Sequence, residues 1–185
     1  FCAENVTLLE KAMQAGARRI ELCDNLAVGG TTPSYGVTKA AVKLAADYDT
    51  TIMTMIRPRG GDFVYNDLEI AIMLEDIALT AQAGSQGVVF GALTADKKLD
   101  KANLEKLIAA SKGMEIVFHM AFDELSEQEQ LEAIDWLSQA GVTRILTRAG
   151  VSGDSLEKRF AHYHRILEHA AGKIEILPGG GIDMD

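Results

Sequence analysis

Two short segments near the start of the chain each carry a thiol and a carboxylate, Cys2 with Glu4 and Glu21 with Cys23. Successive side chains of a strand point to opposite faces, so within each segment the two groups share one face. Two thiolates favour a soft ion such as Cu(I), whereas structural zinc requires four ligands that cannot be assembled from this sequence. The alternative is that Cys2 and Cys23 are small buried core residues.

The two glutamates also indicate acid–base chemistry. In one interpretation a strand-end acid forms an ion pair with Arg57 and seals the fold, because buried charges are seldom left unpaired. In the other, one carboxylate stays ionised near the Arg57 guanidinium while the second is desolvated and keeps a proton, which yields a general base and a general acid. Both interpretations require the arginine.

One histidine stands apart from the other three. His119 ends an otherwise apolar segment, and we expect it to belong to the site, although a hydrogen-bonded structural role is the alternative. His162, His164 and His169 fall on a helical segment and are expected at its solvated surface. They show no spacing typical of a zinc motif.

Two glycine-rich turns are candidates for binding an anion. The first carries Arg57 and Arg59, which can supply positive charge. The second contains Gly179, Gly180 and Gly181, whose N–H groups either hold a phosphate or simply make a tight turn.

Strand and helix patterns alternate along the whole chain, which is typical of a parallel sheet with helical crossovers. Strands are predicted at 1–4, 20–23, 51–56, 87–90, 115–119, 143–147 and 175–177, and helical spacing recurs at 9–16, 37–48, 70–84, 104–108, 133–141 and 160–171. An Ala-Gly pair precedes three of the strands at intervals of about two strand–helix units. No Gly-x-Gly-x-x-Gly follows the first strand, so a (β/α)8 TIM barrel is favoured over an open doubly wound sheet.

We therefore expect residues 1–185 to form a single TIM-barrel domain, with the start of strand 1 and the last βα unit or units missing from this chain. Working residues of such barrels lie at the carboxyl ends of the strands. That rule gathers the candidates from six strands around one mouth: Cys2, Glu4, Glu21, Cys23, Arg57, Arg59, His119, Asp123, Thr147 and Gly179 to Gly181.

The composition of the chain excludes some classes of binding partner. The formal net charge of −9 argues against nucleic acid or an anionic membrane surface, both of which are bound through clustered Lys and Arg. The sequence has no apolar run long enough to span a bilayer and no secretory signal pattern, so we expect a cytoplasmic protein whose two cysteines are free thiols. A copper ion or a small anionic ligand is the expected partner, and a homo-oligomer is left open.

Seven segments resemble the CutC family of copper homeostasis proteins. They are FCAEN (1–5), GARRIELC (16–23), GGTTPSYG (29–36), IRPRGGDFVY (56–65), GVVFG (87–91), HMAFD (119–123) and PGGG (178–181). The resemblance implies a cytoplasmic (β/α)8 barrel assigned to copper handling, with Cu(I) bound through Cys2 and Cys23. Two positions depart from the family pattern: Met120 replaces a usual arginine, and Arg148 falls in an altered turn.

Two hypotheses follow for the function. The first is a copper-binding protein of copper homeostasis, in which Cys2 and Cys23 are the Cu(I) ligands and Glu4, Glu21, His119 and Thr147 line the site. The second is a barrel enzyme acting on a small phosphorylated or carboxylated substrate. In that case Glu21, His119 and Asp123 share the acid–base work, while Arg57, Arg59, Gly179, Gly180 and Gly181 bind the anion.

Overall fold

Seven parallel strands form the centre of the molecule. The structure is a computed structural model that describes residues 1–150 and 153–180. Each strand pairs with the next one along the chain, so the sheet order follows the sequence. The strands are β1 (Cys2–Glu4), β2 (Arg19–Cys23), β3 (Thr51–Met55), β4 (Gly87–Phe90), β5 (Glu115–Phe118), β6 (Arg144–Thr147) and β7 (Glu175–Pro178).

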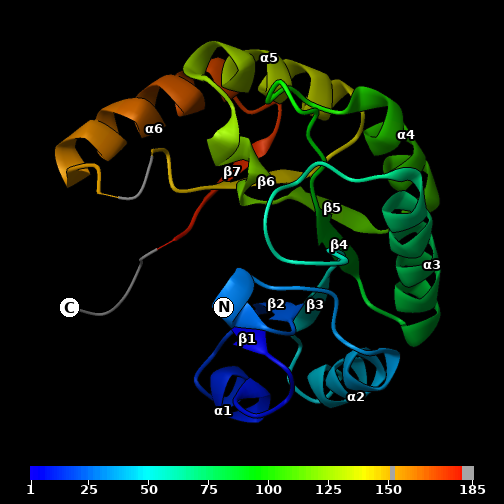
Figure 1. Ribbon diagram of the computed structural model, residues 1–185. Helices are drawn as coiled ribbons and strands as arrows, with labels where there is room; N and C mark the ends of the chain where they lie inside the picture. Colours follow the sequence, from blue (N-terminus) through cyan, green and yellow to red (C-terminus); the bar gives the residue numbers. More distant parts are fainter. Residues whose placement is uncertain (151–152, 181–185) are drawn as a thin grey trace.

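Helices connect the strands and lie around the outer side of the curled sheet (Figure 1). They are α1 (Leu9–Gln14), α2 (Tyr35–Ala45), α3 (Asp67–Ala83), α4 (Lys101–Ala110), α5 (Glu127–Gln139) and α6 (Leu156–Ala170), with 3-10 turns η1 (Leu26–Val28) and η2 (Met120–Glu124). Among the described residues, no helix has the length and apolar content needed to cross a membrane.

This alternation confirms the predicted α/β class, and the sheet curls into part of a barrel. The repeated Ala-Gly device is also confirmed, because Gly16, Gly84 and Gly141 adopt φ values of 96°, 88° and 91°, the left-handed conformation that ends a helix. In the described residues β1 and β7 are the two edge strands. The additional unit that would complete eight strands stays a prediction.

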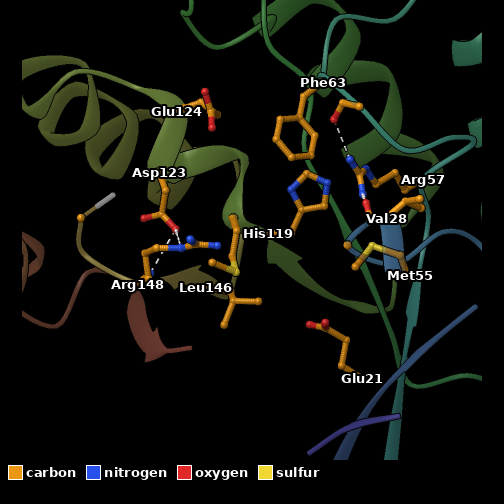
Figure 2. A pocket seen from close by; sticks show the side chains of 14 residues that line it. Glu21, Val28, Met55, Arg57, Phe63, His119, Asp123, Glu124, Leu146 and Arg148 are labelled. Atoms are coloured by element: carbon orange, nitrogen blue, oxygen red, sulfur yellow. Dashed lines mark hydrogen bonds and ion pairs between the residues drawn. The ribbon is translucent and has the colours of Figure 1, made fainter. Parts of the chain in front are cut away.

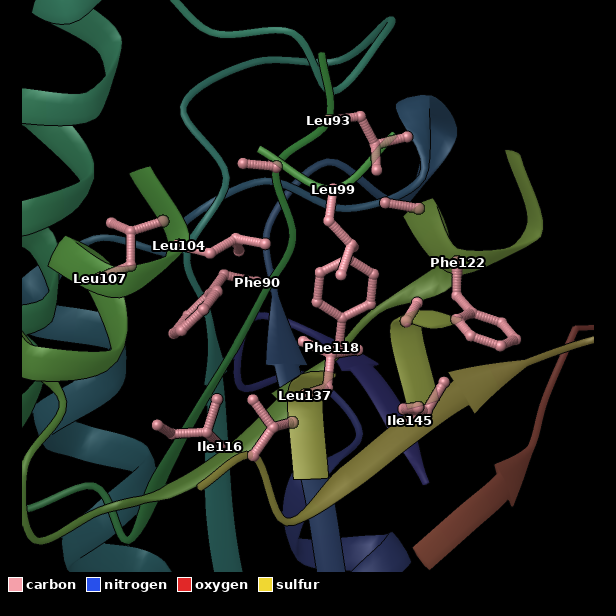
Figure 3. Close-up of a cluster of buried hydrophobic side chains, with 14 of the residues drawn as sticks. Phe90, Leu93, Leu99, Leu104, Leu107, Ile116, Phe118, Phe122, Leu137 and Ile145 are labelled. Carbon is pink, nitrogen blue, oxygen red and sulfur yellow. The ribbon is translucent and has the colours of Figure 1, made fainter. Parts of the chain in front are cut away.

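Large side chains on the outer face of the sheet pack against the helices (Figure 3). Phe90, Phe118 and Ile145 are fully buried there, in one cluster with Leu104 from α4 and Leu137 from α5. Burying a side chain of this size contributes about 1.5–3 kcal/mol. This cluster therefore fixes β4, β5 and β6, whose carboxyl ends carry part of the candidate site.

The inner face of the sheet has its own smaller cluster. Its buried members are Cys23, Met53, Met55, Val89 and Val117, with Leu146 packed against them. The alternation of strand side chains turns these residues inward. In the described part of the chain this inner cluster is thus rich in sulfur and contains no aromatic ring.

Ion pairs occupy the amino-terminal ends of the later strands. Arg144 pairs with Glu115 and with Glu175, the latter at 2.6 Å between Nε and Oε2. Charged side chains hold β5, β6 and β7 together at this end. The carboxyl ends are left for the candidate site.

Candidate functional site

Both cysteines and one of the two predicted glutamates meet on β1 and β2. In the parallel register Cys2 lies opposite Glu21, and Cys23 follows two residues further along β2. The two sulfurs are 3.9 Å apart, and Glu21 Oε1 lies 3.7 Å from Cys2 Sγ and 3.9 Å from Cys23 Sγ. Cys2 is exposed, Cys23 is buried, and both are free thiols. We call this group the thiol–carboxylate triad.

The triad has dimensions suited to a metal ion. The sulfurs of Cys2 and Cys23 and the carboxylate oxygen of Glu21 form a nearly equilateral triangle. The point equidistant from its corners lies about 2.2 Å from each atom, within the ~2.0–2.3 Å range of protein bonds to zinc through oxygen or sulfur. With two of its three donors being sulfur, the set favours a soft ion.

The surroundings of the triad raise the pKa of two of its members. Contact with the Cys2 thiol raises the pKa of Cys23, and burial and the nearby Glu21 carboxylate raise it further. Burial also raises the pKa of Glu21, which the hydrogen bond from Cys2 only partly offsets. The raised pKa means that the Cys23 thiol keeps its hydrogen at neutral pH, so binding a cation through this sulfur must release a proton.

Glu4, the second predicted glutamate, contacts the backbone and not the two cysteines. Its Oε2 accepts a hydrogen bond from the backbone N–H of Leu26 at 2.7 Å, at the start of η1. The carboxylate thereby fixes the turn that follows β2. Glu4 lies outside the triad although it is on the same strand as Cys2.

A cavity of about 420 Å³ opens beside the triad at the carboxyl ends of the strands (Figure 2). It brings together four predicted residues from separate segments, Glu21, Arg57, His119 and Asp123. Its remaining lining residues are Val28, Gly29, Met55, Gly61, Phe63, Met120, Glu124, Leu146, Arg148 and Gly150. Glu21 is the residue that belongs both to this cavity and to the triad.

His119 is buried in the cavity wall, with 3% of its surface exposed. Its Nδ1 accepts a hydrogen bond from Ala121 N–H at 3.2 Å, and its Nε2 has no partner among the described residues. Burial, with a further contribution from the positive charge of Arg57, lowers the pKa of His119 to about 3. The ring is therefore neutral at pH 7, with its proton on Nε2.

The Arg57 guanidinium is held by backbone carbonyls. It donates to Val28 O at 2.9 Å, Gly30 O at 3.0 Å and Gly61 O at 2.7 Å. The expected ion pair with Glu4 or Glu21 is absent from the described residues, because loop carbonyls take the place of the carboxylates. Arg57 therefore brings to the cavity a positive charge that no carboxylate of the described residues pairs with at ion-pair distance.

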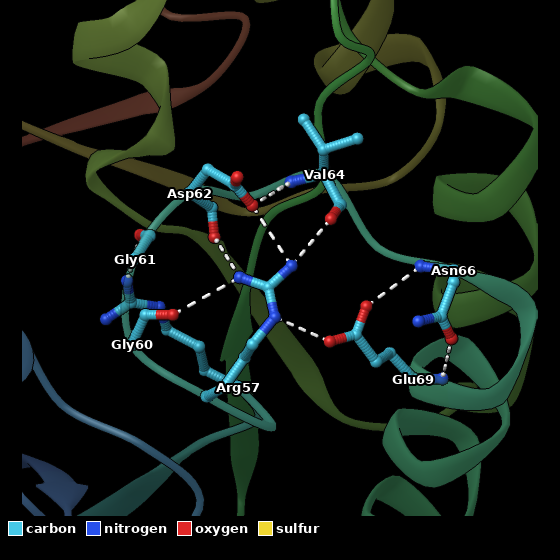
Figure 4. A network of polar contacts seen from close by, with 8 residues as sticks. Arg57, Gly60, Gly61, Asp62, Val64, Asn66 and Glu69 are labelled. Carbon is cyan, nitrogen blue, oxygen red and sulfur yellow. Dashed lines mark hydrogen bonds and ion pairs between the residues drawn. The ribbon is translucent and has the colours of Figure 1, made fainter.

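Arg59 is not among the cavity-lining residues and organises its own loop, whose polar network is drawn in Figure 4. Its Nε donates to Glu69 at 2.5 Å, and its terminal nitrogens donate to Asp62 and to the carbonyls of Gly60 and Val64. Glu69 in turn closes a capping box with Asn66 at the start of α3. Arg59 was predicted to bind an anion, but its guanidinium nitrogens are all engaged within the β3–α3 loop.

Asp123 positions the turn after β6. Its carboxylate accepts hydrogen bonds from the Thr147 hydroxyl and, at 3.1 Å, from Arg148 N–H. Arg148 Nε also lies 3.7 Å from Asp123 Oδ2. Burial raises the pKa of Asp123, and the Thr147 hydrogen bond opposes that shift. Thr147 thus contacts the cavity residue Asp123 but is not itself among the cavity-lining residues.

The glycine turn after β7 is only partly described. Gly179 N–H donates to Thr147 O at 2.9 Å, which continues the pairing with β6. A Cβ on Gly179 would overlap Leu146, and Gly180 adopts a φ of 77°. Packing explains the glycine at 179 and the left-handed backbone explains the one at 180, while anion binding by this turn stays a prediction and Gly181 lies outside the described residues.

One surface assignment is wrong. His162 is buried, with Nε2 2.6 Å from Gln130 Oε1, whereas His164 is exposed and His169 is half-buried beside Asp135. The reason is that α6 packs its His162 face onto α5. Gln130 Nε2 then donates to Phe122 O at 3.1 Å, so this contact supports η2.

Phe63 and Met55 line the cavity, although neither is predicted as a site residue from the sequence. Met55 shares a strand face with Arg57, a signal that was available. Phe63 lies in an irregular loop where no periodicity applies. Its ring centroid is 4.8 Å from the His119 ring and 4.8 Å from Arg57 Cζ, so it joins these two residues in one wall.

Comparison with known proteins places this geometry in a family. The model of the CutC family matches residues 1–185. The chain belongs to the CutC family. A CutC protein of Enterococcus faecalis is 51% identical over 185 residues, covering 100% of this chain and 88% of that protein. The human protein named copper homeostasis protein cutC homolog is 40% identical over 181 residues, covering 98% of this chain and 64% of that protein.

Solved structures agree with this membership. The crystal structure of CutC from Streptococcus agalactiae superposes with a TM-score of 0.94 at 46% identity, covering 98% of this chain and 87% of that one. Deoxyribose phosphate aldolase from Aeropyrum pernix shares only the fold, with a TM-score of 0.70 at 14% identity over 98% of this chain and 74% of that one. In this CutC-family chain no described strand or cavity-lining position carries a lysine, the residue that forms Schiff bases with carbonyl substrates.

Proposed function

We propose that this protein acts in copper homeostasis by binding one Cu(I) ion at the thiol–carboxylate triad. The triangle formed by the sulfurs of Cys2 and Cys23 and the Glu21 oxygen carries the proposal. Family membership and the copper homeostasis name of the human relative give the physiological setting. Soft thiolates select Cu(I) over harder divalent ions.

The difference in exposure between the two cysteines fits an ion that is taken up and released. Cys23 is buried and anchors the ion inside the barrel, while the exposed Cys2 offers an approach for an incoming or departing ligand. We place this exchange in the cytoplasm, where thiols stay reduced and copper is held as Cu(I).

An anaerobic Cu(I) titration against a competing chelator tests this function. We expect one ion to bind per chain in the wild type, and the Cys2→Ser, Cys23→Ser double variant to lose at least about 100-fold in affinity, since both soft donors are removed. Glu4→Gln is the matched control, because Glu4 is on β1 but is bonded to Leu26 instead of the sulfurs. Equal affinity in the double variant and the wild type would refute the proposal.

A further inference from the structure

The cavity beside the triad contains polar groups that copper binding does not use. His119 Nε2 is buried and unpartnered among the described residues, and it belongs to a residue that lines the cavity. A buried N–H group without an acceptor is rare, because a buried donor that makes no hydrogen bond costs about 1–3 kcal/mol. A ligand that supplies an acceptor at this point would recover that cost.

The protonation state of His119 identifies what it offers. Ala121 N–H occupies Nδ1, so the ring hydrogen is on Nε2 and this nitrogen, on the side of the ring nearer Arg57, can act only as a donor. The depressed pKa of the ring agrees with this neutral form. An acceptor-rich ligand is therefore favoured over a second hydrogen-bond donor.

Arg57 adds charge beside this donor. Phe63 contacts both side chains, so the guanidinium and the imidazole belong to one wall (Figure 2). The acceptors of Arg57 are three neutral carbonyls, and no carboxylate of the described residues lies within ion-pair distance of it. Asp62 interacts with the Arg57 charge at longer range and is paired with Arg59, so an anionic group of a ligand would be the first to lie within ion-pair distance of Arg57.

The other charged groups that face the cavity are largely compensated. Asp123 is engaged by Thr147 and Arg148, and Glu124 pairs with Lys97 at 3.1 Å. The remaining carboxylate, Glu21, accepts hydrogen bonds from the Cys2 and Cys23 thiols. None of these three carboxylates is therefore paired with Arg57.

We propose that this cavity binds a small organic molecule through an oxyanion group, a carboxylate or a phosphate, which accepts the His119 Nε2–H bond beside the Arg57 charge. The apolar part of the molecule would lie against Met55, Phe63 and Leu146, which complete the wall. The volume of about 420 Å³ is at the lower end of the range for small-molecule sites, ~300–1,000 Å³. Neither cysteine lines the cavity, and Glu21 is the residue that the cavity shares with the triad, so the copper-free protein is the form to titrate.

Titrations of the copper-free protein test the site. The probes are inorganic phosphate, 3-phosphoglycerate and succinate, with glycerol as an uncharged comparison, each followed by calorimetry and by the histidine-ring ¹H–¹⁵N spectrum. We expect at least one oxyanion to bind with a dissociation constant in the millimolar range or below and to shift the His119 Nε2 resonance. Because 3-phosphoglycerate also carries a carboxylate, preference for both inorganic phosphate and 3-phosphoglycerate over succinate identifies a phosphate ligand, and preference for succinate over inorganic phosphate identifies a carboxylate ligand.

Variants assign the binding to His119. His119→Leu removes the donor and should weaken the bound oxyanion about tenfold, whereas His119→Gln keeps an N–H group and should lose less. His164→Leu, at an exposed position of α6, is the matched control and should bind like the wild type. The wild-type spectrum needs no variant, so a folding defect does not obscure the result. No shift of the His119 resonance with any oxyanion, or an equal shift with glycerol, would overturn the proposal.

Discussion

Glu21 lies directly opposite Cys2 in the parallel register of β1 and β2, and its Oε1 is 3.7 Å from the Cys2 sulfur. Glu4 shares a strand with Cys2 but accepts a hydrogen bond from Leu26 N–H instead. Two carboxylates that the sequence presents as equivalent therefore have separate tasks. One can contribute to a metal site, and the other fixes a turn.

We expect Glu21→Gln to lower Cu(I) affinity by about tenfold or more, because the substitution replaces a charged donor at the third corner of the triad. Glu4→Gln should change the affinity less than about twofold, while lowering stability by about 1 kcal/mol through the weaker bond to Leu26 N–H. Chelator competition and thermal unfolding of both variants measure these effects. Equal affinities for Glu21→Gln and Glu4→Gln would remove Glu21 from the ligand set.

Cu(I) affinity should rise with pH. The pKa of Cys23 is raised above its ordinary value of 9.0, so at neutral pH the thiol must lose its proton before it can bind the ion. Each proton released raises the apparent affinity about tenfold per pH unit while pH stays below that pKa. Competition titrations between pH 6.5 and 8.5 measure the slope, and Cys23→Ser should reduce it. A slope of zero in the wild type would contradict thiolate binding.

Stability should fall in acid partly because of His119. Its pKa drops from 6.5 to about 3 on folding, so below pH 6.5 the unfolded chain binds a proton that the folded protein excludes. Stability from this group is complete above pH 6.5 and is lost as pH falls toward 3, by up to about 1.4 kcal/mol per pH unit.

Calorimetric melting of His119→Gln between pH 7 and 4.5 checks that contribution. The variant should show a shallower dependence on pH than the wild type, and His164→Gln, at an exposed site, should keep the wild-type slope. Identical slopes in all three proteins would mean that His119 is not held neutral by the fold.

Gly87 is required by the packing inside the barrel. A Cβ at this position would overlap the Met53 side chain and lie 2.7 Å from Glu115 O. We expect Gly87→Ala to destabilise the protein by about 1–3 kcal/mol, as overpacked cores do. Gly36→Ala is the control, because its Cβ would meet only Ser34 Oγ at 3.9 Å within α2 and should be neutral or stabilising. Denaturant unfolding of the two variants compares the positions.

The sequence by itself determined the order of strands and helices and which side chains share a strand face. Alternation in strands and the 3.6-residue period of helices are local properties, so Glu21 and Cys23 could be placed on one face from spacing alone. The Ala-Gly pairs likewise mark helix ends because a left-handed residue is needed there, as at Gly84.

Only the tertiary structure decided what each polar side chain contacts. Arg57 and Arg59 occupy one loop in the sequence, yet Arg57 faces the cavity and Arg59 is engaged by Glu69. The helical pattern predicts a solvated His162, but α6 packs onto α5 and places this ring beside Gln130. The strand pattern predicts Glu4 at the metal site, but its carboxylate accepts a hydrogen bond from Leu26 N–H in η1. Hydrogen-bond partners distant in the sequence satisfy these groups, and periodicity carries no information about which partner the folded chain brings within reach.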